Sequence, residues 1–142
     1  MYLCIENEFT QFYFMKKYIL DLVVTQNIKL HANYVLIKLT HANPLPEMLP
    51  GQFAEIRIDG SNTTFLRRPI SINYVDKTTN EVWFLVQLVG DGTRKLATVK
   101  QGDIVNVVMR LGNGFAMPRN VTKGKPLLVG GGVGTAPMLM LG

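Results

Sequence analysis

The chain has 142 residues and a formal net charge of +5, and 47% of its residues are hydrophobic. This length allows one domain of ordinary size with a real core, and the apolar fraction excludes a disordered protein. Basic residues occur as the separate pairs Lys16-Lys17, Arg67-Arg68 and Arg94-Lys95, and not as a stripe. A small excess of positive charge that is spread over the chain suits phosphate-bearing ligands or an acidic partner, and it argues against nucleic acid binding.

The few cysteines and histidines of the chain limit the disulfides and metal sites that it can form. The single cysteine, Cys4, excludes an internal disulfide and agrees with a cytoplasmic location. One cysteine cannot hold an iron–sulfur cluster, and neither His31 nor His41 has a second candidate ligand at helical spacing, so no metal site is predicted in this chain. No apolar run approaches the ~18 residues that a membrane span requires, so no membrane association is expected.

In chain order, residues 1–14 have no clean period, and two interpretations stay open: a non-native or disordered extension, or an added element packed on the domain. Six segments downstream have the β-branched and aromatic content of strands. They are Tyr18–Val24, Tyr34–Thr40, Phe53–Ile58, Arg68–Tyr74, Glu81–Val89 and Asp103–Met109. The polar segment Thr25–Asn33 is predicted to be a loop, and Trp83 is expected to pack in the core or on the barrel, with flavin stacking as the alternative. Short strands joined by loops predict an antiparallel barrel.

One short helix is expected between the last two strands. It follows Gly90-Asp91-Gly92 and spans Thr93–Val99, with Thr93 as a plausible N-cap. The free amides at such a helix start would attract an anion.

The stretch with the most chemistry is Phe65–Ile72, where two arginines run into Pro69 and a short strand. Pro69 fixes its own φ and biases Arg68 toward extended geometry. Arginine supplies a planar fork of donors that suits a phosphate, and the hydroxyl of Ser71 can donate or accept at a heteroatom ring. A solvated strand edge is the alternative interpretation.

A glycine-rich turn lies near the end of the chain. The apolar run Pro126–Val129 predicts a buried parallel strand, and a helix is expected from Ala136 onward. Between them, Gly130, Gly131, Gly132, Val133 and Gly134 form a possible phosphate turn for NAD, because such glycines let backbone amides approach a pyrophosphate. A purely structural turn is the alternative.

Arg68-Pro69-Ile70-Ser71 resembles the flavin-binding signature of the ferredoxin-reductase-like superfamily, Arg-x-Tyr-Ser/Thr. Ile70 stands in the position of the tyrosine. In this feature the sequence resembles one branch of the superfamily, the electron-transfer subunit of NAD-linked dihydroorotate dehydrogenase. Four further stretches follow the family's order. They are Pro50–Phe53, Gly90–Thr93, Leu111–Phe115 and Gly130–Pro137.

This resemblance implies a mainly β fold. It would be a six-stranded antiparallel Greek-key barrel that binds FAD over residues 15–120, followed in 121–142 by the first strand and glycine turn of an incomplete α/β nucleotide-binding domain. The chain is therefore expected to be a fragment that is inactive by itself.

The resemblance also assigns roles to residues. Arg68 would pair with the pyrophosphate of FAD, Ser71 would sit by the isoalloxazine ring, and Pro69 and Ile70 lie between them. The backbone of Leu85, Val86 and Gln87 would run beside the cofactor, and Gly92 and Thr93 would close on the phosphates. Gln87 stands where the family often has an arginine, so it keeps hydrogen bonding and loses a charge. No catalytic acid, base or nucleophile is implied.

The implied activity is electron transfer from dihydroorotate oxidation, through a [2Fe-2S] centre and FAD, to NAD in pyrimidine biosynthesis. The cluster would belong to the full-length subunit only. The implied partner is a catalytic dihydroorotate dehydrogenase subunit in a heterotetramer. Two alternatives stay open: another flavin reductase subunit, such as a ferredoxin–NADP reductase or a hydrogenase partner, or a flavin-free barrel that only binds a protein.

Overall fold

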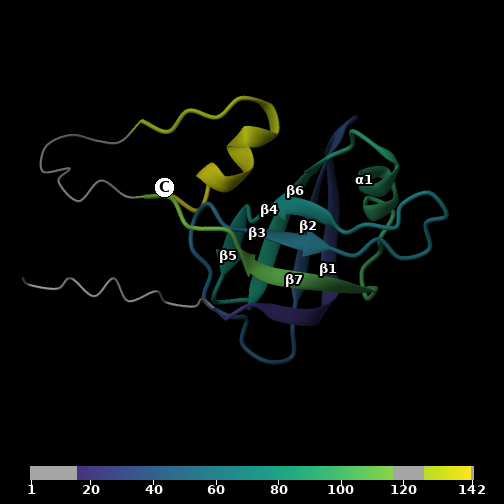
Figure 1. Ribbon diagram of the computed structural model, residues 1–142, viewed down its shortest axis with the longest axis horizontal. Helices are drawn as coiled ribbons and strands as arrows, with labels where there is room; N and C mark the ends of the chain where they lie inside the picture. Colours follow the sequence, from purple (N-terminus) through teal and green to yellow (C-terminus); the bar gives the residue numbers. More distant parts are fainter. Residues whose placement is uncertain (1–15, 117–126, 142) are drawn as a thin grey trace, which may run out of the picture.

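Strands dominate the structure, as the alternating apolar residues predict. The computed structural model describes residues 16–116 and 127–141, so the predicted N-terminal extension, residues 1–14, lies outside the described part. The described strands are β1 Tyr18–His31, β2 Tyr34–Thr40, β3 Phe53–Ile56, β4 Arg68–Ser71, β5 Tyr74–Asp76, β6 Glu81–Gln87 and β7 Ile104–Leu111. The helices are α1 Asp91–Leu96 and the 3₁₀-helix η1 Gly132–Met138 (Figure 1).

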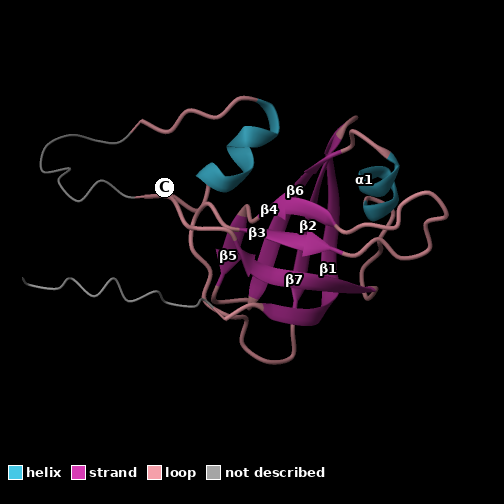
Figure 2. Cartoon of the chain, in the orientation of Figure 1, coloured by secondary structure: helices cyan, strands magenta, loops and turns pink. Residues whose placement is uncertain are grey.

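The strands form one curled antiparallel sheet in the order β4-β3-β7-β1-β2-β6-β5. Because β7 pairs between β3 and β1, the connections are of the Greek-key type. The curl brings β4 against β6, although the two strands are far apart in the order of the sheet (Figure 2). The predicted mainly β, antiparallel barrel architecture is confirmed, with seven strands in place of six.

The additional strand arises from a break in the predicted strand Arg68–Tyr74. The backbone N–H of Ile72 donates to the Gln52 carbonyl beside β3, at 3.0 Å. The next N–H, that of Asn73, donates to the Trp83 carbonyl of β6, at 2.9 Å. Consecutive residues therefore bond to the two opposite sides of the curl, and the chain crosses from the β4 edge to the β5 edge.

The predicted loop Thr25–Asn33 is wrong, because β1 continues through it to His31. Residues of β1 pair with β2 along this stretch, with bulges between Val24 and Gln26 and between Lys29 and His31. Most side chains of this half of β1 are exposed. Its polar sequence therefore reflects a hairpin that extends beyond the core into solvent.

The core is built from alternate residues of the strands. Fully buried side chains include Leu22 of β1, Ile37 of β2, Phe84 of β6 and Val107 of β7. Trp83 does not join them: it lies on the outer face of β6, half-buried, with the Tyr74 ring 5.1 Å away and Lys38 Nζ 4.0 Å above its own ring. Of the two expected packing roles of Trp83, core or barrel, the structure shows packing on the outside of the barrel.

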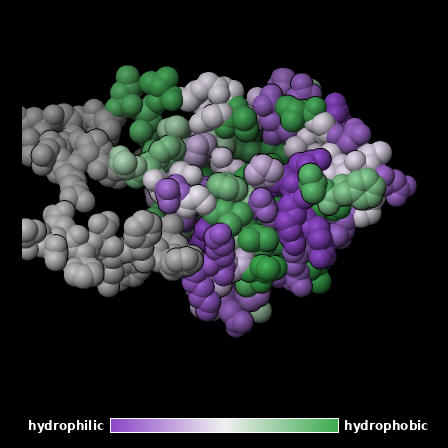
Figure 3. Space-filling view, viewed as in Figure 1, coloured by the Kyte–Doolittle hydropathy of each residue, from purple (hydrophilic) through white to green (hydrophobic). Residues whose placement is uncertain are grey.

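Hydrophobic and hydrophilic residues are interspersed on the outside of the barrel (Figure 3). Large apolar side chains that are exposed include Ile19, Phe65, Leu66, Val89 and Ile104. In the described part of the chain, neither helix has the length and apolar character needed to cross a lipid bilayer.

The predicted strand before the glycine turn is absent from the described residues. Leu127, Leu128 and Val129 have no strand pairing, and Pro126 lies outside the described part. A parallel strand needs a neighbour for its backbone groups, and the described sheet offers none at this point.

Gln52 is fully buried and connects two loops. Its side-chain oxygen accepts from the Leu49 N–H at 2.9 Å, and its amide donates to the Gly112 carbonyl at 3.2 Å. We expect Gln52→Leu to lower the free energy of unfolding by about 1–3 kcal/mol, because it removes two hydrogen bonds that a buried side chain makes to the backbone of the two loops. Urea denaturation measures the loss. Gln101→Leu, at an exposed position, is the control and should change stability by less than about 0.5 kcal/mol; equal effects of the two variants would contradict the role of Gln52.

Candidate functional site

A cavity of about 380 Å³ opens where β4, β6, the start of α1 and η1 meet. Seven of the nine residues predicted to bind the cofactor line it. They are Arg68, Pro69, Ile70, Ser71, Leu85, Gln87 and Thr93. Val133 and Gly134 of the predicted nucleotide turn line the same cavity. Residues from four separate parts of the sequence are therefore brought to one place.

The remaining two predicted residues lie directly behind the cavity wall. Val86 is fully buried, and its side chain faces the core, between the lining residues Leu85 and Gln87. That the backbone of these three residues runs beside a cofactor stays a prediction. Gly92 lies against Arg68: a Cβ added at Gly92 would meet Arg68 Nε at 2.6 Å. Glycine at this position lets the arginine lie along the start of α1.

Arg68 begins β4 and pairs with Ile56 of β3. Arg68 is half-buried, and no carboxylate of the described residues forms an ion pair with its guanidinium. Its hydrogen bond is a long one, 3.5 Å from Nη1 to the Arg67 carbonyl. A guanidinium that is partly desolvated without an acidic partner is suited to an anionic ligand.

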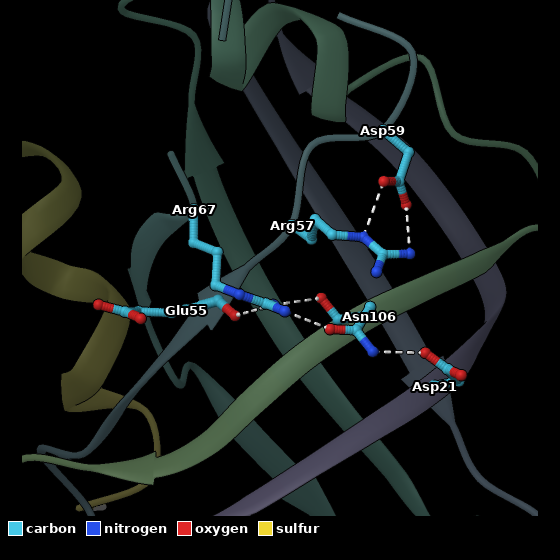
Figure 4. Close-up of polar contacts among 6 residues, drawn as sticks. All are labelled: Asp21, Glu55, Arg57, Asp59, Arg67 and Asn106. Atoms are coloured by element: carbon cyan, nitrogen blue, oxygen red, sulfur yellow. Dashed lines mark hydrogen bonds and ion pairs between the residues drawn. The ribbon is translucent and has the colours of Figure 1, made fainter. Parts of the chain in front are cut away.

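Arg67, the adjacent residue, has a different role (Figure 4). Its Nη1 donates to the carbonyls of Glu55 and Asn106 at 3.3 and 3.1 Å, and its Nη2 donates to the Asn106 side chain. The Asn106 amide in turn donates to Asp21 at 2.6 Å. Arg67 therefore fixes β3 to β7 on the outside of the sheet.

A second arginine beside this network is also satisfied by the protein. Arg57 forms a two-fold contact with Asp59, at 2.7 and 3.1 Å (Figure 4). The hydrogen bond and the charge of Asp59 raise the pKa of Arg57 above its ordinary value. Of the arginines before and within β4, Arg68 alone faces the cavity.

The segment Gly90–Thr93 differs from the predicted helix start. Gly90, not Thr93, is the N-cap, and α1 runs from Asp91 to Leu96. The Thr93 hydroxyl accepts from the N–H groups of Val89 and Gly90, both at 3.1 Å, and donates to the Gly90 carbonyl at 3.0 Å. These bonds occupy the donor and both lone pairs of the hydroxyl. Thr93 therefore shapes the turn, and the backbone amides of the first turn are the groups left for an anion.

The glycine-rich segment forms one wall of the cavity. A helix is present at Ala136, but the expected start is wrong: the helix is a 3₁₀-helix that already begins at Gly132 and ends at Met138. A Cβ at Gly130 would lie 2.8 Å from the Thr135 Cα and 2.9 Å from the Gly134 oxygen, so only glycine fits this close turn. Whether this segment binds the phosphates of NAD stays a prediction.

Two other stretches of the resemblance serve the fold. Gln52 of Pro50–Phe53 donates to Gly112 of Leu111–Phe115, and the Phe115 N–H donates to the Pro50 carbonyl at 2.8 Å. Three lining residues, Val89, Ala136 and Pro137, were missed by sequence reasoning because nothing polar marks them. In the described part of the chain, no three side chains of His, Cys, Asp or Glu gather as a metal site would require.

Comparison with known proteins places this geometry among electron-transfer reductases. The fold matches the Amycolatopsis cytochrome P450 reductase GcoB with a TM-score of 0.71 and 26% identity, over 87% of this chain and 37% of that one. It also matches an NADH-dependent reduced ferredoxin-NADP oxidoreductase with a TM-score of 0.69 and 28% identity, over 82% of this chain and 41% of that one. The fold is therefore the ferredoxin-reductase-like one.

Proteins that are similar in sequence indicate a more specific group within these reductases. The chain is 42% identical over 98 residues to the electron transfer subunit of dihydroorotate dehydrogenase B (NAD(+)) of Lysinibacillus sphaericus, which covers 69% of this chain and 38% of that protein. It is 45% identical over 92 residues to the same subunit of Bacillus cereus strain Q1, over 65% of this chain and 36% of that protein. The chain thus spans less than two fifths of the length of these curated relatives. No family model matches it.

The contrast between the adjacent arginines can be tested by stability alone. We expect Arg67→Ala to lower the free energy of unfolding by about 1–3 kcal/mol, because it removes charge-assisted hydrogen bonds that connect β3 to β7. Urea denaturation measures the change. Arg94→Ala, at an exposed position on α1, is the matched control and should cost well under about 1 kcal/mol. If Arg67→Ala is as mild as the control, the network in Figure 4 is not a stabilising one.

Proposed function

We propose that this chain is the FAD-binding part of an electron-transfer subunit of an NAD-linked dihydroorotate dehydrogenase. The observation that carries the proposal is that Arg68, Ser71 and the first turn of α1 border one cavity, and that Arg68 has no acidic partner among the described residues. The relatives at 42% and 45% identity, which are electron transfer subunits of that enzyme, support the same function.

The donor set of the cavity fits a flavin dinucleotide. Arg68 supplies the forked cation that a pyrophosphate requires, and Gly92 leaves room for it beside the free amides of α1. Ser71 is half-buried and offers a hydroxyl to the heteroatoms of a ring, while Leu85 and Gln87 give an apolar and a polar contact from β6. Ile70 supplies an aliphatic surface where the family signature has a tyrosine.

When bound, FAD would supply the hydride and single-electron chemistry, which the protein itself does not perform. The residues of this chain bind and orient the flavin: Arg68 holds the charged end and Ser71 the ring. Val133 and Gly134 line the same cavity and would limit the access of water to one side of a bound flavin. No acid, base or nucleophile of the chain is needed.

The wider assignment belongs to the same proposal. Electrons from dihydroorotate oxidation would pass from a catalytic partner subunit, through a [2Fe-2S] centre in the full-length subunit and FAD, to NAD, in a cytoplasmic heterotetramer of pyrimidine biosynthesis. Another flavin reductase subunit is the second candidate, because the fold is shared with reductases of other systems. Binding of the full-length subunit to a dihydroorotate-oxidising subunit favours the first candidate, and absence of binding favours the second.

Flavin binding can be followed with the protein's own fluorescence. Trp83 is the single tryptophan, and it lies on the same outer face of β6 as Leu85 and Gln87, which line the cavity. We expect FAD to quench Trp83 emission in a saturable way, because the flavin absorbs where tryptophan emits and would bind within a few side chains of it. A chain whose Trp83 emission ignores FAD would contradict the proposed function and favour a protein-binding barrel.

The role of Arg68 gives a quantitative test. We expect Arg68→Ala to weaken FAD binding by about 1.5–3 kcal/mol, roughly 10- to 150-fold, because it removes a hydrogen-bonded cation from the pyrophosphate. Titration followed by Trp83 emission measures the change. Arg57→Ala is the control, since that arginine pairs with Asp59 and does not line the cavity. Equal affinity of wild type and Arg68→Ala would mean that Arg68 is only a surface residue.

A further inference from the structure

Asn73 connects the barrel to the glycine-rich segment by a buried hydrogen bond. Its side-chain Nδ2 donates to the Ala136 carbonyl of η1 at 2.7 Å. The exposed fraction of Asn73 is 7% and that of Ala136 is 1%, so water does not compete for this bond. The residues are 63 positions apart in the sequence.

The backbone of Asn73 is held as firmly as its side chain. Asn73 follows β4 at the crossing described above, and its N–H donates to the Trp83 carbonyl of β6. Ile72, one position earlier, is fully buried. The side-chain amide therefore projects from a fixed point between β4 and β6.

Apolar packing and few polar contacts fix the segment that Asn73 holds: Ala136 is buried, and Met140 packs against the core of the barrel. Hydrogen bonds within Leu127–Leu141 are local, such as Thr135 Oγ1 to the Gly132 carbonyl at 2.8 Å and the Gly134 N–H to the Gly131 carbonyl at 3.0 Å. Across residues 16–116 and 127–141, the Asn73–Ala136 bond is the one hydrogen bond that joins this segment to the barrel. Figure 1 shows the yellow η1 helix beside the sheet, and its main contacts with the strands are with β6.

The position of this bond matters because η1 supplies part of the cavity wall. Val133, Gly134, Ala136 and Pro137 line the cavity together with Arg68 and Ser71 of β4. If η1 moved away, the cavity would lose that wall while the groups of β4 and β6 stayed in place.

We propose that Asn73 is a positioning residue of the flavin site: it holds the glycine-rich segment against β4 and β6 so that this segment covers the bound flavin ring. The inference rests on the proposed function and deepens it. It assigns a role to a residue outside the Arg68–Ser71 signature. Strand β4 would then bind the flavin, and Asn73, which follows β4, would hold the segment that covers it.

The test compares three variants of the whole chain. Asn73→Ala removes the side-chain amide, and Asn73→Asp keeps its shape but, when ionised, cannot donate to the Ala136 carbonyl. Asn27→Ala is the matched control, because Asn27 Nδ2 likewise donates to backbone carbonyls, those of Ala97 at 2.9 Å and Val99 at 2.8 Å, and does not line the cavity. Far-UV circular dichroism and urea denaturation establish that each variant is folded.

The first arm uses the protein without flavin. We expect hydrogen exchange of the amides in Gly132–Met138 to be about tenfold faster in both Asn73 variants, the factor that corresponds to one buried hydrogen bond of about 1.4 kcal/mol. Exchange of this segment should be unchanged in Asn27→Ala. Unchanged exchange in the Asn73 variants would overturn the proposal.

The second arm measures the cover itself, with FAD bound and iodide as a quencher of flavin fluorescence. We expect iodide to quench severalfold more effectively in the Asn73 variants than in wild type or Asn27→Ala, and FAD to dissociate faster. Faster exchange with wild-type quenching would reduce Asn73 to a structural residue and overturn the proposal. If wild type takes up no FAD, the proposed function fails and the covering role fails with it, while the first arm still shows separately whether Asn73 holds η1.

Discussion

The structure depends on one crossing of the chain, at Ile72 and Asn73. Two consecutive N–H groups bond to carbonyls on opposite sides of the curled sheet, that of Gln52 beside β3 and that of Trp83 on β6. Neighbouring N–H groups of an extended chain point in opposite directions, so a residue pair at this point can join two edges that a flat sheet would keep apart. The crossing brings β4 beside β6, and the cavity lies where they meet.

Adjacent residues near this crossing have different roles, because their side chains point in different directions. Arg67 faces the outside of the sheet and is saturated by Glu55 and Asn106, whereas Arg68 faces the cavity without an acidic partner among the described residues. Ile72 enters the core and Asn73 reaches η1. Because strand side chains alternate between faces, a short segment can hold the sheet together and furnish a binding site at the same time.

The stretches that resemble the reductase family fall into two physical kinds. Gln52 and the loop around Gly112 serve the fold, since the buried Gln52 side chain donates to the Gly112 carbonyl. Arg68, Ser71 and the start of α1 leave groups directed at a cavity. The similarity to electron transfer subunits covers 69% of this chain and 38% of the L. sphaericus protein.

Sequence patterns determined the class of fold and five of the strands within a few residues, because alternation and the chemistry of Pro69 act over a few positions. The four-residue signature at the cavity came from the resemblance to the reductase family. Sequence patterns gave wrong predictions where contacts between distant residues determine the local structure. The polar second half of β1 is a strand because β2 pairs with it, and Thr93 is not the N-cap because its hydroxyl is taken by the turn before it. Tertiary structure also decided which arginine faces the cavity and that Asn73 meets Ala136, since a bond across 63 residues leaves no local trace in the sequence.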